Sequence, residues 1–345
     1  MSHIWRKRLL LSFIGIIFMV LIFLALGLGL FLVTPLNKDA KKQTFVVRKG
    51  MALREVAAEL EKRELIRSKE FFLLWARFKR YGKHIKAGEY SLGGYMSPVE
   101  ILEKLHRGII ITRPVTVPEG YTMAQIAKLL NDKGLVKKEV FLSMARDPAV
   151  LKRYGIQGPS LEGYLYPDTY RFGSGVSAEV VIDTMVRRFF QVVSPLKGRM
   201  KEVGMNTKQV ITLASIVEKE TSRPEERATV ASVFLNRLKR GMRLESDPTV
   251  IYGIKNFSGN LTKKDLAKKT PYNTYAVKGL PPGPIANPGL ESIKAVIYPA
   301  KADYLYFVSK NDGSHYFSKT LAEHNRAVQI YQKQRKRKHQ KRLDR

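Results

Sequence analysis

An apolar run near the N-terminus constrains this chain more than any other feature. Residues Leu9 to Val33 contain no charged side chain and are rich in Leu, Ile, Phe and Val. A helix needs about 20 such residues to cross the hydrocarbon core of a bilayer, so the run predicts a transmembrane helix. A cleaved signal peptide is the alternative, but its apolar stretch usually has about 7 to 15 residues and ends in a small-residue cleavage site. No such site closes this run before Thr34 and Pro35.

The orientation of this helix is less constrained, because both of its flanks are basic. The flanking cations are Arg6, Lys7 and Arg8 on one side and Lys38, Lys41 and Lys42 on the other. A long domain crosses the membrane largely regardless of its charge. We therefore expect a cytoplasmic head over residues 1–8, a helix over 9–33 and an exported body. The absence of Cys agrees with an oxidising compartment.

The formal net charge of +31 requires a polyanion or an anionic surface nearby. Nucleic acid is not indicated, because the sequence shows no helix-turn-helix, zinc-finger or RNP signature and the charge is spread along the chain. Anionic phospholipid head groups or acidic wall polymers fit better. The basic end over residues 333–345 is predicted to be a solvated, disordered tail.

An internal repeat follows the apolar run. An offset of 70 residues aligns Val47 with Val117, Gly50 with Gly120, Ala57 with Ala127, Leu60 with Leu130, Leu65 with Leu135 and Phe71 with Phe141. Each copy predicts a strand, a Gly turn and two helices. The first copy, within residues 44–110, closes with a strand over 86–92, an order similar to a LysM-type glycan-binding module. A scaffold that spaces the remainder from the membrane is the alternative. The second copy is expected within 111–155.

The rest of the chain, residues 156–332, alternates helical and turn-rich segments. Helices are predicted near 178–192 and 207–220, and Pro224 and Gly241 bracket another. A Pro- and Gly-rich loop spans 279–289, and a strand pattern covers 304–309. We expect an α+β domain with an antiparallel sheet beside helices that present Glu218.

Glu218 lies in a segment whose apolar residues fall on more than one face, as in a helix buried on most sides. It shares a stripe with the small residues Ala214 and Ser215, which leave room for a substrate. A carboxyl buried with few charge partners keeps its proton more readily, as a general acid near neutral pH must. The alternative is that Glu218 and Glu220 only pair with nearby Lys or Arg, and spacing does not decide between these readings. Glu220 lies on the stripe of Leu213, Ile216 and Val217 and could be the buried one as well, although its position nearer the helix end favours solvent or a salt bridge.

Five motifs, in this order, carry a resemblance. They are Glu162-Gly-Tyr-Leu-Tyr-Pro-Asp-Thr-Tyr170, Leu213-Ala-Ser-Ile-Val-Glu-Lys-Glu-Thr221, Ser246-Asp-Pro-Thr-Val-Ile-Tyr252, Pro271-Tyr-Asn-Thr-Tyr275 and Gly279-Leu-Pro-Pro-Gly-Pro-Ile-Ala-Asn-Pro-Gly289. Together they resemble the MltG (YceG-like) family of endolytic murein transglycosylases over nearly the whole chain. The resemblance implies that Glu218, the first glutamate of the Glu-Lys-Glu run, is catalytic.

The resemblance also implies a reaction. The enzyme protonates the oxygen that joins N-acetylmuramic acid to N-acetylglucosamine, and the muramoyl 6-hydroxyl closes on C1 to leave a 1,6-anhydro end. One glutamate can serve first as acid and then as base. The implied setting is the bacterial inner (cytoplasmic) membrane, with the catalytic part in the periplasm or otherwise outside the cytoplasm. There it would cut nascent peptidoglycan strands, terminate their elongation and work beside peptidoglycan synthases, the penicillin-binding proteins.

The motifs supply further candidates for substrate contact. These are Tyr166, Asp247, Tyr252, Tyr275 and Asn287. Tyrosines offer flat faces and hydroxyls to a sugar chain, although they are equally common in cores and rims. His315 and His324 have no second ligand at metal-binding spacing, and no phosphate or dinucleotide fingerprint occurs, so neither a metal nor a cofactor is expected.

Two other functions stay open. A muramidase-type hydrolase would use Glu218 with Asp247 or another carboxylate and would leave a reducing end. A non-catalytic, membrane-anchored peptidoglycan-binding scaffold would use Glu218 only as an ion-pairing residue.

Overall fold

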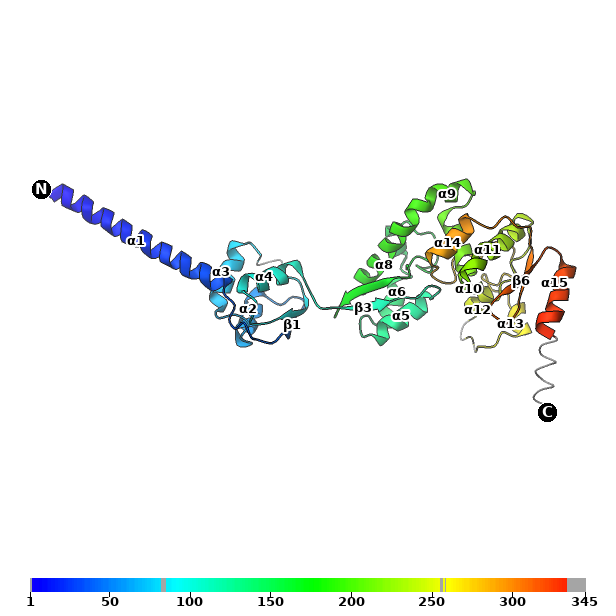
Figure 1. Cartoon of the computed structure of the whole chain (residues 1–345), viewed down its shortest axis with the longest axis horizontal. Helices are drawn as coiled ribbons and strands as arrows, with labels where there is room; N and C mark the ends of the chain where they lie inside the picture. Colours follow the sequence, from blue (N-terminus) through cyan, green and yellow to red (C-terminus); the bar gives the residue numbers. More distant parts are fainter. Residues whose placement is uncertain (1, 82–84, 255–256, 258, 334–345) are drawn as a thin grey trace, which may run out of the picture. The chain divides into compact units, whose positions relative to one another are not determined.

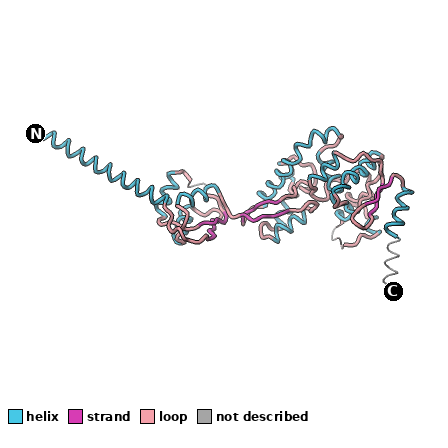
Figure 2. Tube along the Cα trace, viewed as in Figure 1, coloured by secondary structure: helices cyan, strands magenta, loops and turns pink. Residues whose placement is uncertain are grey.

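The computed structural model describes residues 2–81, 85–254, 257 and 259–333. They divide into two compact units (Figure 1). The first comprises residues 1–113 with 173–175, and the second comprises 114–172 with 176–345. The predicted basic tail lies outside the described residues from 334 onward. Strands and helices occur in both units, so the mixed α+β class is confirmed (Figure 2).

The first unit begins with a single long helix, α1 (Ser2–Val33). Its part from Leu11 to Val33 is long and apolar enough to cross a membrane. Few of the side chains in this part are buried, and large apolar groups such as Phe18 and Phe23 are exposed. A helix with this surface is compatible with the predicted membrane anchor.

A small α/β module follows α1. Strands β1 and β2 pair antiparallel, with Phe45 opposite Tyr90, and both of these rings are fully buried. The predicted order of strand, helix, helix and strand is confirmed. An additional helix, α4, starts with a capping box of Ser97 and Glu100, a signal that the repeat pattern did not reveal. The elements are β1 (Gln43–Val47), α2 (Leu53–Lys62), α3 (Lys69–Phe78), β2 (Gly88–Leu92) and α4 (Pro98–Arg107).

The second copy of the repeat opens the second unit and also closes with a strand, because β3 and β4 form one sheet. Segments beyond the predicted end at residue 155 therefore complete it. Its core continues without a break into that of the remaining helices. The elements are β3 (Thr112–Thr116), α5 (Met123–Asp132), α6 (Lys138–Met144), α7 (Pro148–Arg153) and β4 (Thr169–Gly173).

The predicted alignment of Phe71 with Phe141 is wrong. Phe141 is fully buried in α6, whereas Phe71 on α3 is 45% exposed and its neighbour Phe72 fills the core instead. The connection before α3 is one residue longer than the one before α6: Ser68, the cap of α3, lies three residues after Leu65, and Lys137 lies two residues after Leu135. The offset of 70 therefore becomes 69 in the second helix.

The remainder of the second unit is mainly helical. The helix predicted over 207–220 is confirmed with those bounds, and α10, α11 and α14 pack against one another. The predicted strand near 304–309 is part of an antiparallel hairpin with Tyr306 opposite Ser318. The elements are α8 (Ala178–Val193), η1 (Ser194–Leu196), α9 (Lys197–Glu202), α10 (Thr207–Glu220), α11 (Pro224–Lys239), α12 (Asp247–Gly253), α13 (Lys263–Ala267), α14 (Leu290–Ile297), β5 (Tyr306–Ser309), β6 (His315–Ser318), α15 (Leu321–Val328) and η2 (Gln329–Lys333).

Helix α10 is the central element of this unit. Asn206 caps it and forms a capping box with Gln209, and every residue from Val210 to Val217 is buried. A helix buried around its whole circumference is held rigidly by its neighbours. Glu218 and Glu220 are therefore presented from a fixed support.

Candidate active site

Glu218 lies in the last turn of α10, and its side chain is only 7% exposed. The backbone N–H of Gly289 donates to its Oε2 at 3.0 Å. On the other side, Nη2 of Arg227 lies 3.4 Å from its Oε1. The carboxylate is thus held between one backbone donor and one cation.

The expectation that Glu218 has few charge partners is wrong. A short turn after α10 leads to Pro224, where α11 starts and packs back against α10. This reversal brings Arg227, whose side chain is 11% exposed, onto Glu218. Glu218 therefore does form an ion pair with a nearby arginine, as the alternative predicted. This ion pair does not exclude catalysis, because charged hydrogen-bond donors also stabilise charge that develops during a reaction.

A second carboxylate shares the same arginine. Oε2 of Glu119 lies 3.7 Å from Nη2 of Arg227, and the Glu119 side chain is 47% exposed. Partial burial and the negative charge of Glu218 raise the pKa of Glu119, while Arg227 opposes this. The sequence reasoning missed Glu119. The available signal was the repeat, which places Lys49 at the corresponding position of the first copy and so reverses the charge.

Two glycines allow the backbone to approach these carboxylates. Gly120 has φ +72°, and a Cβ there would lie 3.4 Å from Cγ of Glu218. A Cβ on Gly289 would collide with the carboxyl group of Glu119. The backbone N–H of Gly120 donates to the carbonyl of Asn287 at 2.9 Å, which ties the segment of Gly120 to the loop that carries Gly289.

Gly289 is also the N-cap of α14. The first N–H groups of a helix have no partner within the helix, and the helix dipole adds partial positive charge there. Because the carboxylate of Glu218 accepts the Gly289 N–H, it lies at this helix start. The carboxylate of Glu218 therefore lies between Arg227 and the start of α14.

The loop over 279–289 is anchored to α10 by a buried serine. The backbone N–H of Ile285 donates to Oγ of Ser215 at 3.0 Å, and Ser215 in turn donates to the carbonyl of Thr212 at 2.7 Å. Ser215 lies one turn before Glu218 on the same stripe. The small side chain that was expected to leave room for substrate is used to hold this loop.

Asn287 is fully buried, and its amide is used within the protein. It donates to the carbonyl of Tyr121 and to Oε1 of Glu162, each at 2.9 Å, and accepts from the backbone of Leu165 at 2.9 Å. A side chain with these contacts has no free edge for a sugar. Asn287 positions the loop rather than presenting itself to solvent.

Glu162 is buried, and the sequence motif that contains it did not indicate a role for it. Its Oε1 accepts from the backbone of Met123 at 2.8 Å, and its Oε2 accepts from the hydroxyl of Tyr252 at 3.2 Å. Burial raises the pKa of Glu162 to about 7, although these bonds oppose the shift. Tyr252 and Asn287 therefore meet at Glu162 and not at Glu218.

Glu220 belongs to another polar group. The Ser246 hydroxyl donates to its Oε1 at 2.5 Å, so the expectation of solvent or a salt bridge at Glu220 is wrong. Removal from water, with the charge of Asp247 added, raises the pKa of Glu220 to about 7. Tyr275 donates to Asp247 at 2.8 Å, so both of these predicted residues lie in this group. Two residues correspond to about 200° around a helix, which places Glu218 and Glu220 on different faces.

Tyr166 is buried, and the Arg188 guanidinium lies 5.8 Å from its ring centroid. Burial raises the pKa of Tyr166, and the charge of Glu119 adds to this. Asp168 accepts from its neighbour's backbone N–H at 2.7 Å and pairs with Arg188 at 2.7 Å. Asp168 therefore shapes the loop in which Tyr166 lies.

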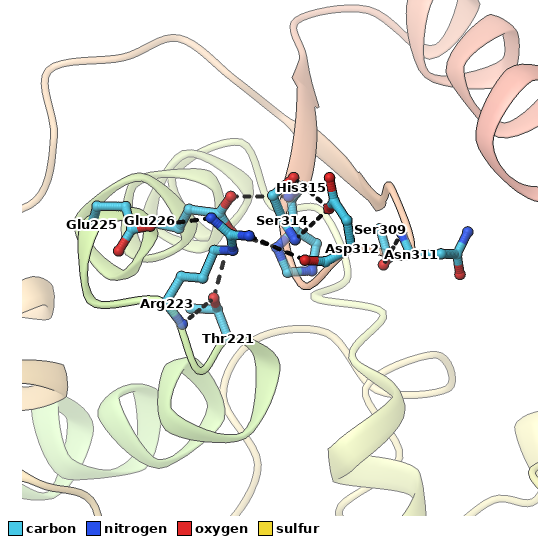
Figure 3. A network of polar contacts seen from close by, with 9 residues as sticks. All are labelled: Thr221, Arg223, Glu225, Glu226, Ser309, Asn311, Asp312, Ser314 and His315. Atoms are coloured by element: carbon cyan, nitrogen blue, oxygen red, sulfur yellow. Dashed lines mark hydrogen bonds and ion pairs between the residues drawn. The ribbon is translucent and has the colours of Figure 1, made fainter.

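The start of α11 is fixed by the β5–β6 hairpin (Figure 3). Glu226 accepts the backbone N–H of His315 at 2.9 Å and lies 2.6 Å from its Nδ1. Arg223 donates to the carbonyl of Asp312 at 3.0 Å. Glu226 and Arg223 both lie just before Arg227 in the sequence, so their contacts fix the turn of α11 from which the Arg227 side chain extends. His315 thus contacts Glu226 through both its backbone and its ring, and the described residues contain no group of three His, Asp or Glu placed to hold a metal.

A family model described as the YceG-like family matches residues 45–330, which include every group described above. The chain belongs to the YceG-like family. The resemblance predicted from the five motifs is confirmed. The match starts in β1 and extends to η2, so it covers both repeat copies and the helices around Glu218.

Relatives and a solved structure agree with this family. The chain is 34% identical to an endolytic murein transglycosylase of Bacillus subtilis (strain 168), over 88% of this chain and 89% of that protein. It is 31% identical to one of Streptococcus pneumoniae, over 85% of this chain and 59% of that protein. A crystal structure of a yceG-like protein from Listeria monocytogenes is 36% identical with a TM-score of 0.58, and covers 84% of this chain and 100% of that one.

Proposed function

We propose that this chain is an endolytic peptidoglycan lytic transglycosylase in which Glu218 is the acid and base. The proposal is supported by relatives named endolytic murein transglycosylases along most of the chain. The observation that carries the assignment of the residue is the carboxylate of Glu218, held on a rigid helix between Arg227 and the start of α14. Its substrate would be the glycan strand of peptidoglycan.

The reaction moves two protons through Glu218, one out and one in. A protonated Glu218 gives its proton to the oxygen between N-acetylmuramic acid and N-acetylglucosamine, and the bond from C1 to that oxygen breaks. The muramoyl 6-hydroxyl oxygen then bonds to C1 and returns its proton to the Glu218 carboxylate. No water is consumed, and the products are a 1,6-anhydro end and a free hydroxyl on N-acetylglucosamine.

Arg227 and the Gly289 N–H act on the state between these two transfers. In that state Glu218 is a carboxylate and the sugar carries positive character at C1. Donors fixed in advance at the carboxylate need not reorganise when the proton leaves, which is the usual source of electrostatic catalysis. Arg227 and Gly289 thus hold Glu218 in place for the return of the proton.

The hydrolase alternative is best supported at Glu119 rather than at Asp247. Asp247 bonds Tyr275 and lies with Glu220, whereas Glu119 shares Arg227 with Glu218. A hydrolase uses two carboxyls that flank the bond, one as acid and one as nucleophile or as base for water. In the transglycosylase, the same Glu119 would face the sugar without forming a bond to it.

One experiment separates these functions. Peptidoglycan is incubated with the intact protein, with Glu218→Gln and with Glu119→Gln, and the released fragments are analysed by mass spectrometry. We expect anhydro-muramoyl ends from the intact protein and at least a hundredfold less product from Glu218→Gln, the size typical for a lost acid or base. Reducing ends that disappear in Glu119→Gln would establish the hydrolase. Unchanged release by Glu218→Gln would refute the assignment of Glu218.

The setting of the reaction is proposed with it. Helix α1 would anchor the chain in the inner membrane with residues 1–8 in the cytoplasm. The catalytic part over 156–332 would then meet nascent strands beside penicillin-binding proteins and terminate their elongation. The antiparallel pair β1 and β2 with two helices between them supports a LysM-like role in glycan binding for residues 44–110. Sedimentation of the full chain with insoluble peptidoglycan, compared for Glu218→Gln and a variant in this module, would test binding apart from catalysis.

A further inference from the structure

Helix α3 has an apolar face that the protein core does not use. Phe71, Leu74 and Phe78 are 45%, 51% and 74% exposed. With Trp75, which is half-buried and also packs against the edge of the core, they follow the spacing of one helical stripe, at positions i, i+3, i+4 and i+7. The opposite side of the same helix supplies Phe72 and Ala76, which are fully buried in the core of the first unit. This outer stripe of Phe71, Leu74, Trp75 and Phe78 is named the α3 face.

The α3 face is organised rather than scattered. The rings of Trp75 and Phe78 stack with their centroids 5.4 Å apart, and Nζ of Lys79 lies 5.2 Å from the Trp75 ring. Single exposed apolar residues are normal on a soluble protein, but contiguous patches usually mark an interaction surface. The one-residue shift between the two repeat copies turns Phe71 outward, where Phe141 of the second copy points inward.

The α3 face is continuous with the apolar surface of α1. The ring of Phe71 lies 5.0 Å from the ring of Phe31, in the last turn of α1. Phe71 also lines a groove along α1 together with Phe23 and Leu28. If α1 crosses a bilayer, Phe71 lies at the level where this span ends. Trp and other amphipathic aromatic side chains concentrate at that level.

The charges around the face match an anionic surface. From Arg67 to Arg80 the sequence contains five cations and one acid, Glu70. The cations are Arg67, Lys69, Arg77, Lys79 and Arg80. Juxtamembrane Lys and Arg are attracted to anionic lipids, and their long stems allow the charged ends to reach head groups while the stems cover apolar surface. Helix α3 contains no Asp, Asn or Gln to bond sugar hydroxyls, and its one acid, Glu70, already accepts from the hydroxyl of Ser68, which favours lipid over a glycan strand.

We propose that the α3 face inserts into the interface of the anionic bilayer that α1 crosses, so that the first module lies on the membrane. Apolar insertion and basic charge then act together with the span, as in proteins that use two membrane signals. The inference needs α1 to cross the bilayer, but it is independent of the reaction at Glu218. In this proposal α3 contacts lipid, and the other surfaces of the module remain accessible for binding a glycan strand.

The chain contains two tryptophans, Trp5 and Trp75, so Trp5→Phe leaves one reporter on the α3 face. The full chain with this change is reconstituted into vesicles of phosphatidylethanolamine and phosphatidylglycerol at about 3:1, the anionic component that basic side chains attract. Lipids brominated at shallow or deep acyl positions are added in parallel series. We expect Trp75 emission to fall about twofold with shallow bromines, less with deep ones, and to resist aqueous acrylamide, as for an interfacial side chain.

A triple variant tests the face itself. With the probe kept at Trp75, Phe71→Ser, Leu74→Ser and Phe78→Ser together should abolish lipid quenching and restore access for acrylamide. A matched control changes Val46→Ser and Ile109→Ser, which are similarly exposed in the same unit, and should leave quenching unchanged. Flotation after alkaline carbonate reports α1 insertion separately in each sample.

Three results would overturn the proposal. The first is full acrylamide access to Trp75 with no bromine quenching in a chain whose α1 is inserted. The second is equal loss of quenching in the triple variant and in the control. The third is a shift of Trp75 emission on addition of soluble uncross-linked glycan strands, with no response to brominated lipid, which would make the face a sugar platform. The readout uses no substrate turnover, so it stands apart from the test of Glu218.

Discussion

Replacing the buried carboxyl of Glu162 by an amide should change how stability depends on pH. Glu162→Gln keeps the side-chain shape, and its Oε1 can still accept from Met123 and Asn287. The amide nitrogen would face the Tyr252 hydroxyl, to which it can donate. The variant therefore removes the titration and preserves the packing.

The magnitude follows from the proton affinity of Glu162. Burial raises its pKa from 4.5 to about 7 in the folded chain. Each tenfold change in proton affinity corresponds to about 1.4 kcal/mol, so the full effect is about 3 kcal/mol. Below pH 4.5 the group is protonated in both states and has no effect. Between pH 4.5 and 7 the unfolded chain releases its proton while the folded chain keeps it, so wild-type stability falls, and it levels off above pH 7.

The measurement is the free energy of unfolding in urea from pH 4 to 8.5, by pulse proteolysis with fragments of the second unit followed separately. We expect Glu162→Gln to gain about 3 kcal/mol relative to wild type between the two ends of this range. Glu139→Gln, an exposed carboxyl in the same unit, is the control and should run parallel to wild type. Parallel curves for wild type and Glu162→Gln would refute the reasoning.

Two further predictions concern the surroundings of Glu218. Arg227→Met leaves Glu218 and Glu119 without their shared cation, and kcat for fragment release should fall at least about tenfold, as when a fixed donor is removed. Arg153→Met, which removes an exposed ion pair with Glu179 instead, should stay within about twofold, and an equal loss in both variants would contradict the assignment. The Cβ added in Gly289→Ala should displace the flexible Glu119 carboxyl while the protein stays folded. The rate of fragment release by Gly289→Ala should therefore equal the rate measured for Glu119→Gln. Gly198→Ala, whose added Cβ meets nothing, is the control, and a Gly289→Ala enzyme as active as this control would show that Glu119 need not occupy its place.

The periodic elements could be predicted because local patterns specify them. Apolar residues at helical spacing and a cap at Asn206 define α10, and the same repeat pattern defines the strands and helices of both copies. The error at Phe71 has a local cause as well. A single additional residue in a connection changes which of two neighbouring aromatics faces the core, and no periodicity within α3 distinguishes Phe71 from Phe72.

The partners of Glu218 could not be predicted, because they come from distant segments. Gly289 follows Glu218 by 71 residues, and Glu119 precedes it by 99. The packing of α11 and α14 decides which face of the end of α10 contacts Gly289 and Glu119. A pattern within one helix does not contain this information. Arg227 is nearer in sequence, but its position depends on the turn that Thr221 and Arg223 form with the hairpin.

Glu162, Glu218 and Glu220 all lie in the sequence motifs, but their surroundings in the structure differ. Glu162 and Glu220 are removed from water and bonded mainly to uncharged donors, namely Tyr252, Asn287 and Ser246. Their pKa values of about 7 leave both groups partly protonated near neutral pH, and their hydrogen bonds stabilise the arrangement of loops. Both Glu162 and Glu218 accept a backbone N–H at a helix start, but Glu218 alone of the three pairs with an arginine and lies beside a half-exposed carboxyl. A group that must give up one proton and accept another is best held by donors that suit its carboxylate, and of the three only Glu218 has an arginine as such a donor. The chemistry is therefore best assigned to Glu218, with Glu162 and Glu220 fixing the segments around it.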